Sequence, residues 1–251
     1  MNGENRFIND QESGCKDQDI RDFDEGVKGF LGDEGPFEYM VEPKLAGITV
    51  ALVYKKGGLE IASTGGNGSR GKYITANIKT LLTVPLTLVQ LDETCSIPGL
   101  LTVEGDVYME FDALLTLNQR RMERGLPPFE HPVDAVADSL KQPNPRITAK
   151  RTLNMFCSGI GAYTGPSYKT HMESMIMLQK WGLRVNRPHI RVCPTIDEVI
   201  RYCCHLEERR TRFPFQIDGA AIKLNRLSLQ EKLSEGDGGP GWAFDYEFKG
   251  T

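Results

Sequence analysis

Lys44 is the residue of this sequence whose type and position most directly suggest chemistry. It lies in VEPKLAGITVALVY, residues 41–54, after a proline and at the start of an apolar stretch. A lysine amine can act as a nucleophile and carry a covalent intermediate. Because a free amine is almost wholly protonated at neutral pH, such a lysine needs burial or neighbouring cations that favour its neutral form. The alternative is an exposed lysine at the edge of a strand.

Asp106, Asp218 and Lys223 carry further charged groups within other predicted strands. Asp106 lies in VEGDVY, and the other two lie in QIDGAAIK. Structural roles stay open for all three residues. Asp106 could face a turn, Asp218 precedes Gly219 in a possible turn, and Lys223 could be a solvated lysine at a strand end.

Signatures of phosphate loops, zinc sites and disulfide frameworks are absent from the sequence. TGGNGSRG, residues 64–71, does not follow the GxxxxGK[ST] spacing of a P-loop, so spacing alone favours a structural turn. None of the six cysteines forms a CxxC pair, and the four histidines are scattered. We therefore assign no metal-ligating residues and predict no structural zinc site and no disulfide framework, and we expect the adjacent Cys203 and Cys204 to be buried thiols.

The net charge of −4 hides an uneven distribution along the 251 residues. Residues 1–38 carry eleven acids and four bases (−7), whereas residues 39–251 carry 23 acids and 26 bases (+3). A nucleic-acid-binding domain usually has a stronger basic surplus, so charge alone does not require a DNA partner. The sequence contains no apolar run of membrane-spanning length and no signal peptide, so we expect a cytoplasmic protein with no membrane partner.

Hydrophobic periodicity and turn residues predict strands and helices that do not alternate as regular βαβ units. Residues 1–16 are polar and aperiodic, and we expect a loose tail there. Strands are expected near residues 37–43, 47–54, 59–64, 100–109, 153–163, 215–225 and 242–248. Helices are expected near residues 17–32, 111–124, 131–142, 167–181, 195–210 and 227–234. This order favours an α+β fold with largely antiparallel sheets.

Several stretches occur in an order that resembles the adenylation domain of NAD-dependent DNA ligases. They are EPKLAG, TGGNGSRGKYIT, VEGDVY, PPFEHPVDAVADSLKQPNPRITAKR, QIDGAAIK and GWAFDYEF. The resemblance covers residues 18–249, and NPRITAKR, residues 144–151, together with the spacing of the blocks makes it specific. It implies the nucleotidyltransferase (ATP-grasp-like ligase) fold, in which two packed, mainly antiparallel sheets with flanking helices enclose a nucleotide cleft.

The resemblance also implies an activity and the residues that perform it. In this family a lysine attacks the adenylyl phosphorus of NAD+, expels nicotinamide mononucleotide, and passes AMP to a 5′-phosphate in nicked duplex DNA, with Mg2+ present. Lys44 matches that nucleophile, Glu42 matches the residue that recognises adenine, and Lys223 matches a phosphate-contacting lysine. Asp106 stands where the family has a glutamate near the ribose or metal. We therefore expect NAD and Mg2+ as cofactors and a role in DNA replication and repair.

The departures from the family pattern fall on polar positions of the site. This chain has Ala46 for an aspartate, Gly65 for an arginine, Asn67 for an aspartate, Glu104 for an arginine, Asp106 for a glutamate, Val133 and Asp134 for an arginine and an asparagine, Lys141 for an arginine, Ser158 for a tyrosine, Gln216 for a glutamate and Glu247 for a lysine.

These departures predict a weaker hold on phosphate groups. Positions 65 and 133 each lose one positive charge and position 247 changes by −2, which gives −4 relative to the family. One pair of unit charges at ~4 Å is worth about 4 kcal/mol at an effective dielectric constant of ~20. We therefore expect poor NAD binding and impaired adenylation. The alternative is a non-catalytic protein that uses the same fold as a nucleotide- or protein-binding module.

The resemblance predicts that residues 17–251 form one adenylation domain. Complete family members also carry an N-terminal domain that grips the nicotinamide half of NAD, and oligonucleotide-binding, zinc and helix-hairpin-helix modules after the adenylation domain. None of these is recognisable in the sequence, so we do not expect this chain alone to seal DNA. The sequence leaves the oligomeric state open.

Overall fold

The computed structural model describes residues 17–32, 37–65, 71–93, 95–165, 167–234 and 241–249, and within them the strands form two sheets. The first sheet has the order β6 (Arg191–Cys193), β1 (Tyr39–Leu45), β7 (Ile217–Leu224) and β8 (Ala243–Glu247). The second has the order β3 (Gly58–Thr64), β2 (Ile48–Lys55), β4 (Leu100–Tyr108) and β5 (Asn154–Tyr163). All neighbouring strands in both sheets are antiparallel, which confirms the predicted α+β class.

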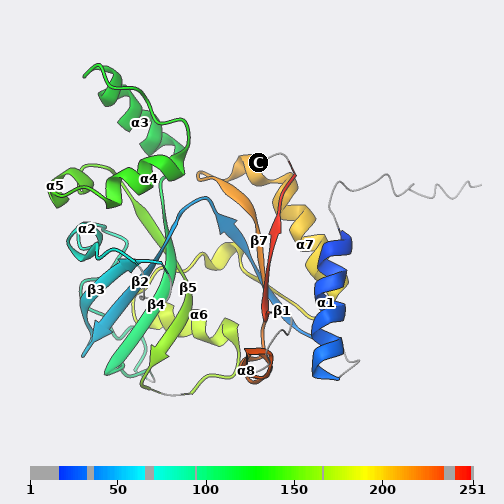
Figure 1. The fold of residues 1–251 in the computed structure, drawn as a ribbon. Coiled ribbons are helices and arrows are strands. Elements are labelled where there is room, and N and C mark those ends of the chain that lie inside the picture. The colour runs from blue at the N-terminus through cyan, green and yellow to red at the C-terminus, as the bar shows by residue number, and fades with distance from the viewer. Residues whose placement is uncertain are drawn as a thin grey trace, which may run out of the picture.

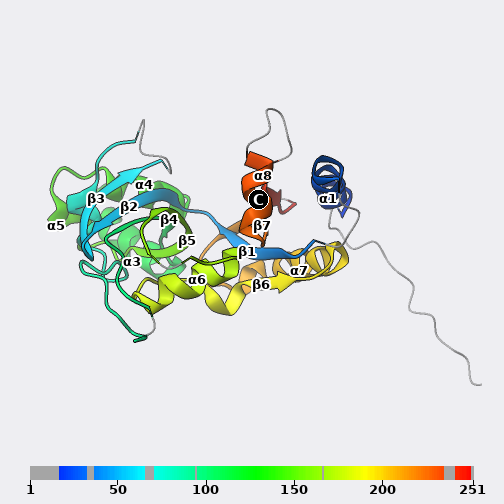
Figure 2. The ribbon, with the colours of Figure 1, turned by 90° about the horizontal axis from the view of Figure 1, so that it is seen from below.

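The molecule has two halves, each made of one sheet and the helices that pack beside it (Figure 1). The second sheet is accompanied by α2 (Thr75–Ile78), α3 (Phe111–Met122), α4 (Pro132–Leu140), α5 (Pro145–Thr148) and α6 (His171–Lys180). The first sheet is accompanied by α1 (Asp17–Leu31), α7 (Ile196–Glu208) and α8 (Leu227–Ser234), and the view from below shows the same division (Figure 2). Short 3-10 helices occupy Arg187–His189 and Arg210–Arg212. Across the described ranges, no helix combines the length and apolarity that crossing a membrane requires.

A connection of two residues joins the sheets. β1 ends at Leu45 and β2 begins at Ile48, so only Ala46 and Gly47 separate a strand of the first sheet from a strand of the second. Gly47 packs against β4 so closely that a Cβ atom there would lie 2.6 Å from the carbonyl oxygen of Val107. The short link therefore fixes the end of β1, which carries Lys44, at the junction of the two sheets.

The hairpin between β2 and β3 shows how local sequence sets the register of the second sheet. Lys56 and Gly57 both adopt left-handed backbone conformations, with φ of 48° and 78°. Two consecutive residues with positive φ between antiparallel strands are typical of a type I′ turn, whose twist matches that of the flanking strands. The turn predicted at residues 55–58 is therefore confirmed.

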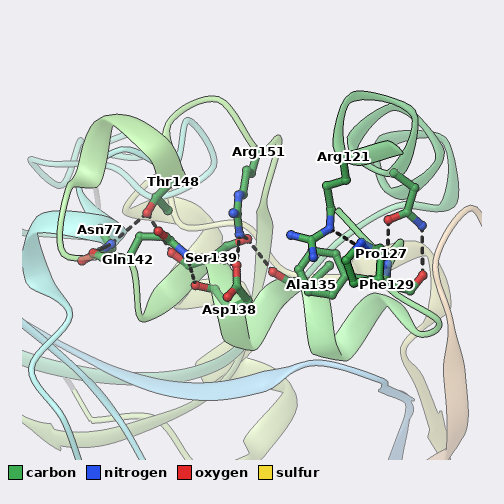
Figure 3. Close-up of polar contacts among 11 residues, drawn as sticks. Asn77, Arg121, Pro127, Phe129, Ala135, Asp138, Ser139, Gln142, Thr148 and Arg151 are labelled. Carbon is green, nitrogen blue, oxygen red and sulfur yellow. Dashed lines mark hydrogen bonds and ion pairs between the residues drawn. The ribbon is translucent and has the colours of Figure 1, made fainter. Parts of the chain in front are cut away.

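A network of side-chain hydrogen bonds holds α2, α4 and the NPRITAKR segment together (Figure 3). The Asn77 amide donates to Thr148 Oγ1 at 2.8 Å, and the Thr148 hydroxyl donates to the Ser139 carbonyl oxygen at 2.8 Å. Arg151 pairs with the Asp138 carboxylate and also donates to Ser139 Oγ at 3.1 Å. Asn77, Ser139 and Thr148 are buried, and buried polar groups are costly without partners, so this network makes their burial tolerable.

The predicted helices and strands agree with the structure to within a few residues at their ends, but α2, α5, β6 and the 3-10 helix at Arg187–His189 were missed. The helix expected from residue 167 begins at His171, because Thr170 caps it and completes a capping box with Glu173. α2, α5 and β6 have only three or four residues each, too few for hydrophobic periodicity to reveal. Cys203 is buried as expected, whereas Cys204 is only half-buried. The predicted tail and most of the glycine-rich stretch, including Asn67, lie outside the described residues.

The close contact between β4 and β5 predicts a strict requirement for glycine at position 105. A Cβ atom there would lie 2.3 Å from the Phe156 carbonyl oxygen and 2.8 Å from Cys157 Cα, so the strands would have to separate. We expect Gly105→Ala to lower the free energy of unfolding by about 2–3 kcal/mol in urea denaturation. Gly159→Ala on β5 is the matched control, because no atom lies within 4 Å of its Cβ position, and equal effects of the two changes would contradict the packing argument.

Candidate active site

The junction of the two sheets contains a cavity of about 410 Å3. Glu42 and Lys44 reach it from β1, Asp106 from β4 and Lys223 from β7. Glu42 and Lys44 are two positions apart on one strand, so their side chains leave the same face of the sheet. The structure thus brings together all four residues that the sequence selected as site candidates, from three strands of two sheets.

Glu42 and Lys223 form an ion pair in the wall of the cavity. Lys223 Nζ lies 2.5 Å from Glu42 Oε1 and donates to the Ser158 carbonyl oxygen at 2.8 Å. Both side chains are largely buried, and burial raises the pKa of the Glu42 carboxyl while the charge of Lys223 opposes that rise. The possible solvated position of Lys223 at a strand end is therefore excluded.

Lys44 is held by two carboxylates of β8. Its Nζ lies 3.0 Å from Asp245 Oδ2 and 3.8 Å from Glu247 Oε1. The Lys44 side chain is 33% exposed, so it stands at the rim of the cavity and not at its floor. An ammonium group in an ion pair has no lone pair for attack, so this pair must open before Lys44 can act as a nucleophile.

Asp106 reaches the cavity from the second sheet. Thr49 Oγ1 donates to Asp106 Oδ1 at 2.7 Å, across the β2–β4 pair. Burial raises the pKa of the Asp106 carboxyl, and the Thr49 hydrogen bond and the charge of Lys223 oppose this rise. Burial also raises the pKa of Glu104, two residues earlier on β4. Glu104 and Asp106 are two positions apart on β4, so both carboxylates lie on the same face of that strand.

His171 contacts Ser158, one of the residues that line the cavity. The sequence analysis did not select this histidine. Its Nε2 lies 3.1 Å from the Ser158 carbonyl oxygen, the same atom that accepts from Lys223. Burial, followed by the nearby charge of Lys223, lowers the pKa of His171 to about 3. The neutral ring therefore donates from Nε2 to this carbonyl near neutral pH. No local motif announces the contact, because α6 and β5 meet only in the folded chain.

The electrostatic balance of the cavity is negative. Four carboxylates line it, from Glu42, Asp106, Asp218 and Asp245, against the two lysines Lys44 and Lys223, which gives a formal balance of −2. Asp218, for which the sequence left a turn role open, lies on β7 and accepts a hydrogen bond from Gln216 at 3.0 Å.

Several departures from the family pattern are located at this cavity. Five of them line it directly: Ala46, Asp106, Val133, Ser158 and Gln216. A sixth, Glu247, lies beside Lys44. Val133 stands where the family has an arginine, so the cavity lining lacks a cation there, and Glu247 places a carboxylate beside Lys44 where the family has a lysine.

A magnesium site is not apparent in the part of the chain that the structure describes. No group of three or more aspartate, glutamate, histidine or cysteine side chains there surrounds a common point. Mg2+ prefers near-octahedral oxygen coordination, often through one or two carboxylates together with water and substrate phosphates. The chain's own residues therefore do not define a metal position, and we derive no catalytic step from one.

Comparison with known proteins identifies relatives of this chain. The family model described as the NAD-dependent DNA ligase adenylation domain matches residues 9–251. A DNA ligase of Citrifermentans bemidjiense is 40% identical over 239 residues, covering 94% of this chain and 35% of that protein. A DNA ligase of Syntrophotalea carbinolica is 38% identical over 237 residues, again covering 94% of this chain and 35% of the relative. The chain therefore spans about a third of the length of these relatives.

One solved structure has a weaker likeness. It is described as a putative ATP-dependent DNA ligase from Aquifex aeolicus, and it aligns with a TM-score of 0.40 and 14% identity over 78% of this chain and 43% of that chain. The two-sheet architecture therefore rests on the strand pairing described above.

The buried His171 predicts how stability depends on pH. Its pKa is about 3 in the folded chain and 6.5 ordinarily, so the unfolded state binds more protons between these values. The free energy of unfolding should therefore fall as the pH drops below 6.5, by about 2 kcal/mol at pH 5 from this group.

Urea denaturation at pH 5 and at a pH well above 6.5 tests this assignment. His171→Gln should remove most of that pH dependence, whereas His205→Gln, which changes an exposed histidine of α7, should leave it in place. An unchanged pH dependence in His171→Gln would mean that the histidine is not buried in its neutral form.

Proposed function

Because this chain belongs to the family of NAD-dependent DNA ligase adenylation domains, we propose that its cavity binds the adenylyl part of NAD+ and that Lys44 accepts AMP. The observation that supports this most strongly is the shared cavity. Lys44 lines it together with Glu42, Asp106 and Lys223, which are the positions that match the family's nucleotide-binding residues. A volume of about 410 Å3 lies in the range of small-molecule sites.

In the proposed step Lys44 forms a phosphoramidate. Its ammonium group leaves the ion pair with Asp245, gives a proton to solvent water, and attacks the adenylyl phosphorus with the freed electron pair. The nitrogen–phosphorus bond forms as the bond from phosphorus to the nicotinamide mononucleotide oxygen breaks. Nicotinamide mononucleotide departs with that electron pair, and AMP stays on Lys44.

The Glu42–Lys223 pair has a positioning role in this proposal. Glu42 is fixed by Lys223 on one side, so its carboxylate is oriented before a nucleotide arrives. A carboxylate accepts hydrogen bonds from an exocyclic amine, and this suits the adenine recognition that the family resemblance assigns to Glu42. Lys223 supplies a positive charge next to the bound nucleotide, and it is anchored to the Ser158 carbonyl.

We further propose that adenylation is slow in this chain. The cavity has a formal balance of −2, and Glu247 adds another carboxylate near Lys44. Negative charge at this position repels the two phosphates of NAD+, and the resemblance supplies Mg2+ as the ion that would offset it. Transfer of AMP to nicked duplex DNA is proposed from the relatives, of which this chain spans 35%, so sealing would require the rest of such a protein.

A non-catalytic function on the same fold is the second candidate. The observation that favours it is the pairing of both cavity lysines with carboxylates, Lys223 with Glu42 and Lys44 with Asp245. In that case the chain binds a nucleotide or a protein without forming a covalent bond.

The mass of the intact chain distinguishes the two candidates. After incubation with NAD+ and Mg2+, we expect a fraction of molecules to gain the mass of one AMP group. Lys44→Ala should abolish the gain, whereas Lys55→Ala, which changes an exposed lysine of β2, should retain it. Absence of any adduct, with NAD+ binding still detectable by calorimetry, would reject the enzyme and support the binding module.

Restoring the family residues tests the charge explanation. We expect Ala46→Asp with Glu247→Lys to speed adduct formation only when Val133→Arg is added, since position 133 lines the cavity and lacks the family's cation. The triple variant should form the adduct about tenfold faster or more, which corresponds to about 1.4 kcal/mol. The check is the initial rate by intact mass, and full recovery by one change alone would show that the charge loss is not shared among these positions.

A further inference from the structure

Strand β7 has a glycine at the position that lies between Lys44 of β1 and Glu247 of β8. β7 lies between β1 and β8, and Lys44, Gly219 and Glu247 are register partners across the three strands. Adjacent strands lie about 4.8 Å apart, so the backbones at Lys44 and Glu247 are separated by about 10 Å. Their side chains can approach because Gly219 places no side chain between them. A Cβ atom at Gly219 would lie 2.0 Å from the Tyr246 carbonyl oxygen.

Asp245 occupies the next outward position on the same face of β8. Its register partner on β7 is Ala221, another small residue, and the partner of Ala221 on β1 is Glu42. From there Asp245 reaches diagonally to Lys44, with 3.0 Å between Oδ2 and Nζ, closer than the 3.8 Å of Glu247. Lys44 thus has a primary counterion in Asp245 and a secondary one in Glu247.

We propose that Asp245 is a counterion clamp that holds the side-chain nitrogen of Lys44 in an ion pair, so that adenylation proceeds only from molecules in which this pair is open. The inference rests on the proposed function, in which Lys44 is the AMP acceptor, and it names the residue that controls that step. Asp245 acts through Lys44 and makes no bond to the transferred group, so it is a positioning residue.

The exposure of the pair makes the clamp reversible. The Lys44 side chain is 33% exposed and that of Asp245 is 57% exposed, so water screens their attraction. Exposed ion pairs shift an equilibrium by about two- to fivefold, which is enough to hold the amine most of the time without blocking it. An incoming phosphate group carries negative charge and competes with Asp245 for Lys44.

Removing the Asp245 charge has two effects that must be separated. It frees the amine, and it also lessens the repulsion of an anionic substrate. An uncharged electrophile reports the first effect alone. Competitive labelling with a trace of acetic anhydride, read by peptide mass spectrometry, measures the reactivity of Lys44 relative to other lysines of the same molecule.

We expect Asp245→Asn, and likewise Asp245→Ser, to raise acetylation of Lys44 about threefold and to leave Lys55 unchanged. The matched control is Glu60→Gln. Lys55 Nζ lies 3.0 Å from Glu60 Oε2 on the β2–β3 hairpin, so this change should affect labelling of Lys55 and not of Lys44. At about 1 M salt, where the Debye length is about 3 Å, the difference at Lys44 should shrink. Unchanged labelling of Lys44 in both Asp245 variants overturns the clamp.

The rate of AMP attachment separates the clamp from the function on which it rests. Asp245→Asn should raise the maximal rate at saturating NAD+ about threefold, whereas relief of repulsion alone would lower the half-saturating NAD+ concentration and leave that maximal rate unchanged. If labelling rises but neither protein forms a Lys44 adduct, the clamp stands and the proposed adenylation fails. If adducts form at equal maximal rates and labelling is unchanged, the adenylation stands and the clamp fails.

Discussion

The buried ion pair between Glu42 and Lys223 is the interaction on which the rest of the cavity depends. Taking two charges out of water is costly, and the loss is recovered only when each has good partners. Here the pair joins β1 to β7, and Lys223 also donates to Ser158 on β5 of the other sheet. His171 donates to the same carbonyl from α6. The pair and the Ser158 carbonyl thus connect both sheets and α6. Removal of either partner would leave the other as a buried charge without its counterion.

This arrangement explains how the cavity combines a rigid wall with an adjustable rim. At the wall, Glu42 and Lys223 are largely buried and hydrogen-bonded. At the rim, Lys44, Asp245 and Glu247 are solvated, and their pairings can be exchanged for others at little cost. In the function proposed above, the wall would recognise the nucleotide and Lys44 at the rim would carry the chemistry. The acidic side chains at the rim would then affect turnover more directly than they affect the fold.

Much of the fold could be predicted because strand and helix patterns are local. The nearly continuous apolar run of β2 and the turn at Lys56 and Gly57 can each be recognised from a few neighbouring residues. The convergence of Glu42, Lys44, Asp106 and Lys223 was also predictable, but only from motif order, since the four come from three strands.

The contacts that sequence reasoning missed are made by register and packing. Asp245 meets Lys44 because β8 pairs with β7 in one particular register, and nothing near position 245 in the sequence reports that alignment. His171 meets Ser158 because α6 packs on β5, and a lone histidine carries no signal of such a partner. The short α5 is likewise stabilised by Thr148 and its tertiary hydrogen bonds, which propensity does not capture.

Gly219 has a consequence for how this wall can change through evolution. Because β8 passes so close, position 219 of β7 admits no side chain and must remain glycine. The outer positions have no such limit, since Asp245 and Glu247 project from exposed sites of β8. Mutation can therefore reverse the sign of charge facing Lys44 one codon at a time while the backbone stays in place. Sequence differences between active and inactive proteins with this fold should therefore be found mainly on the edge strand β8. The inner strand β7 should keep its small residue at position 219 in both.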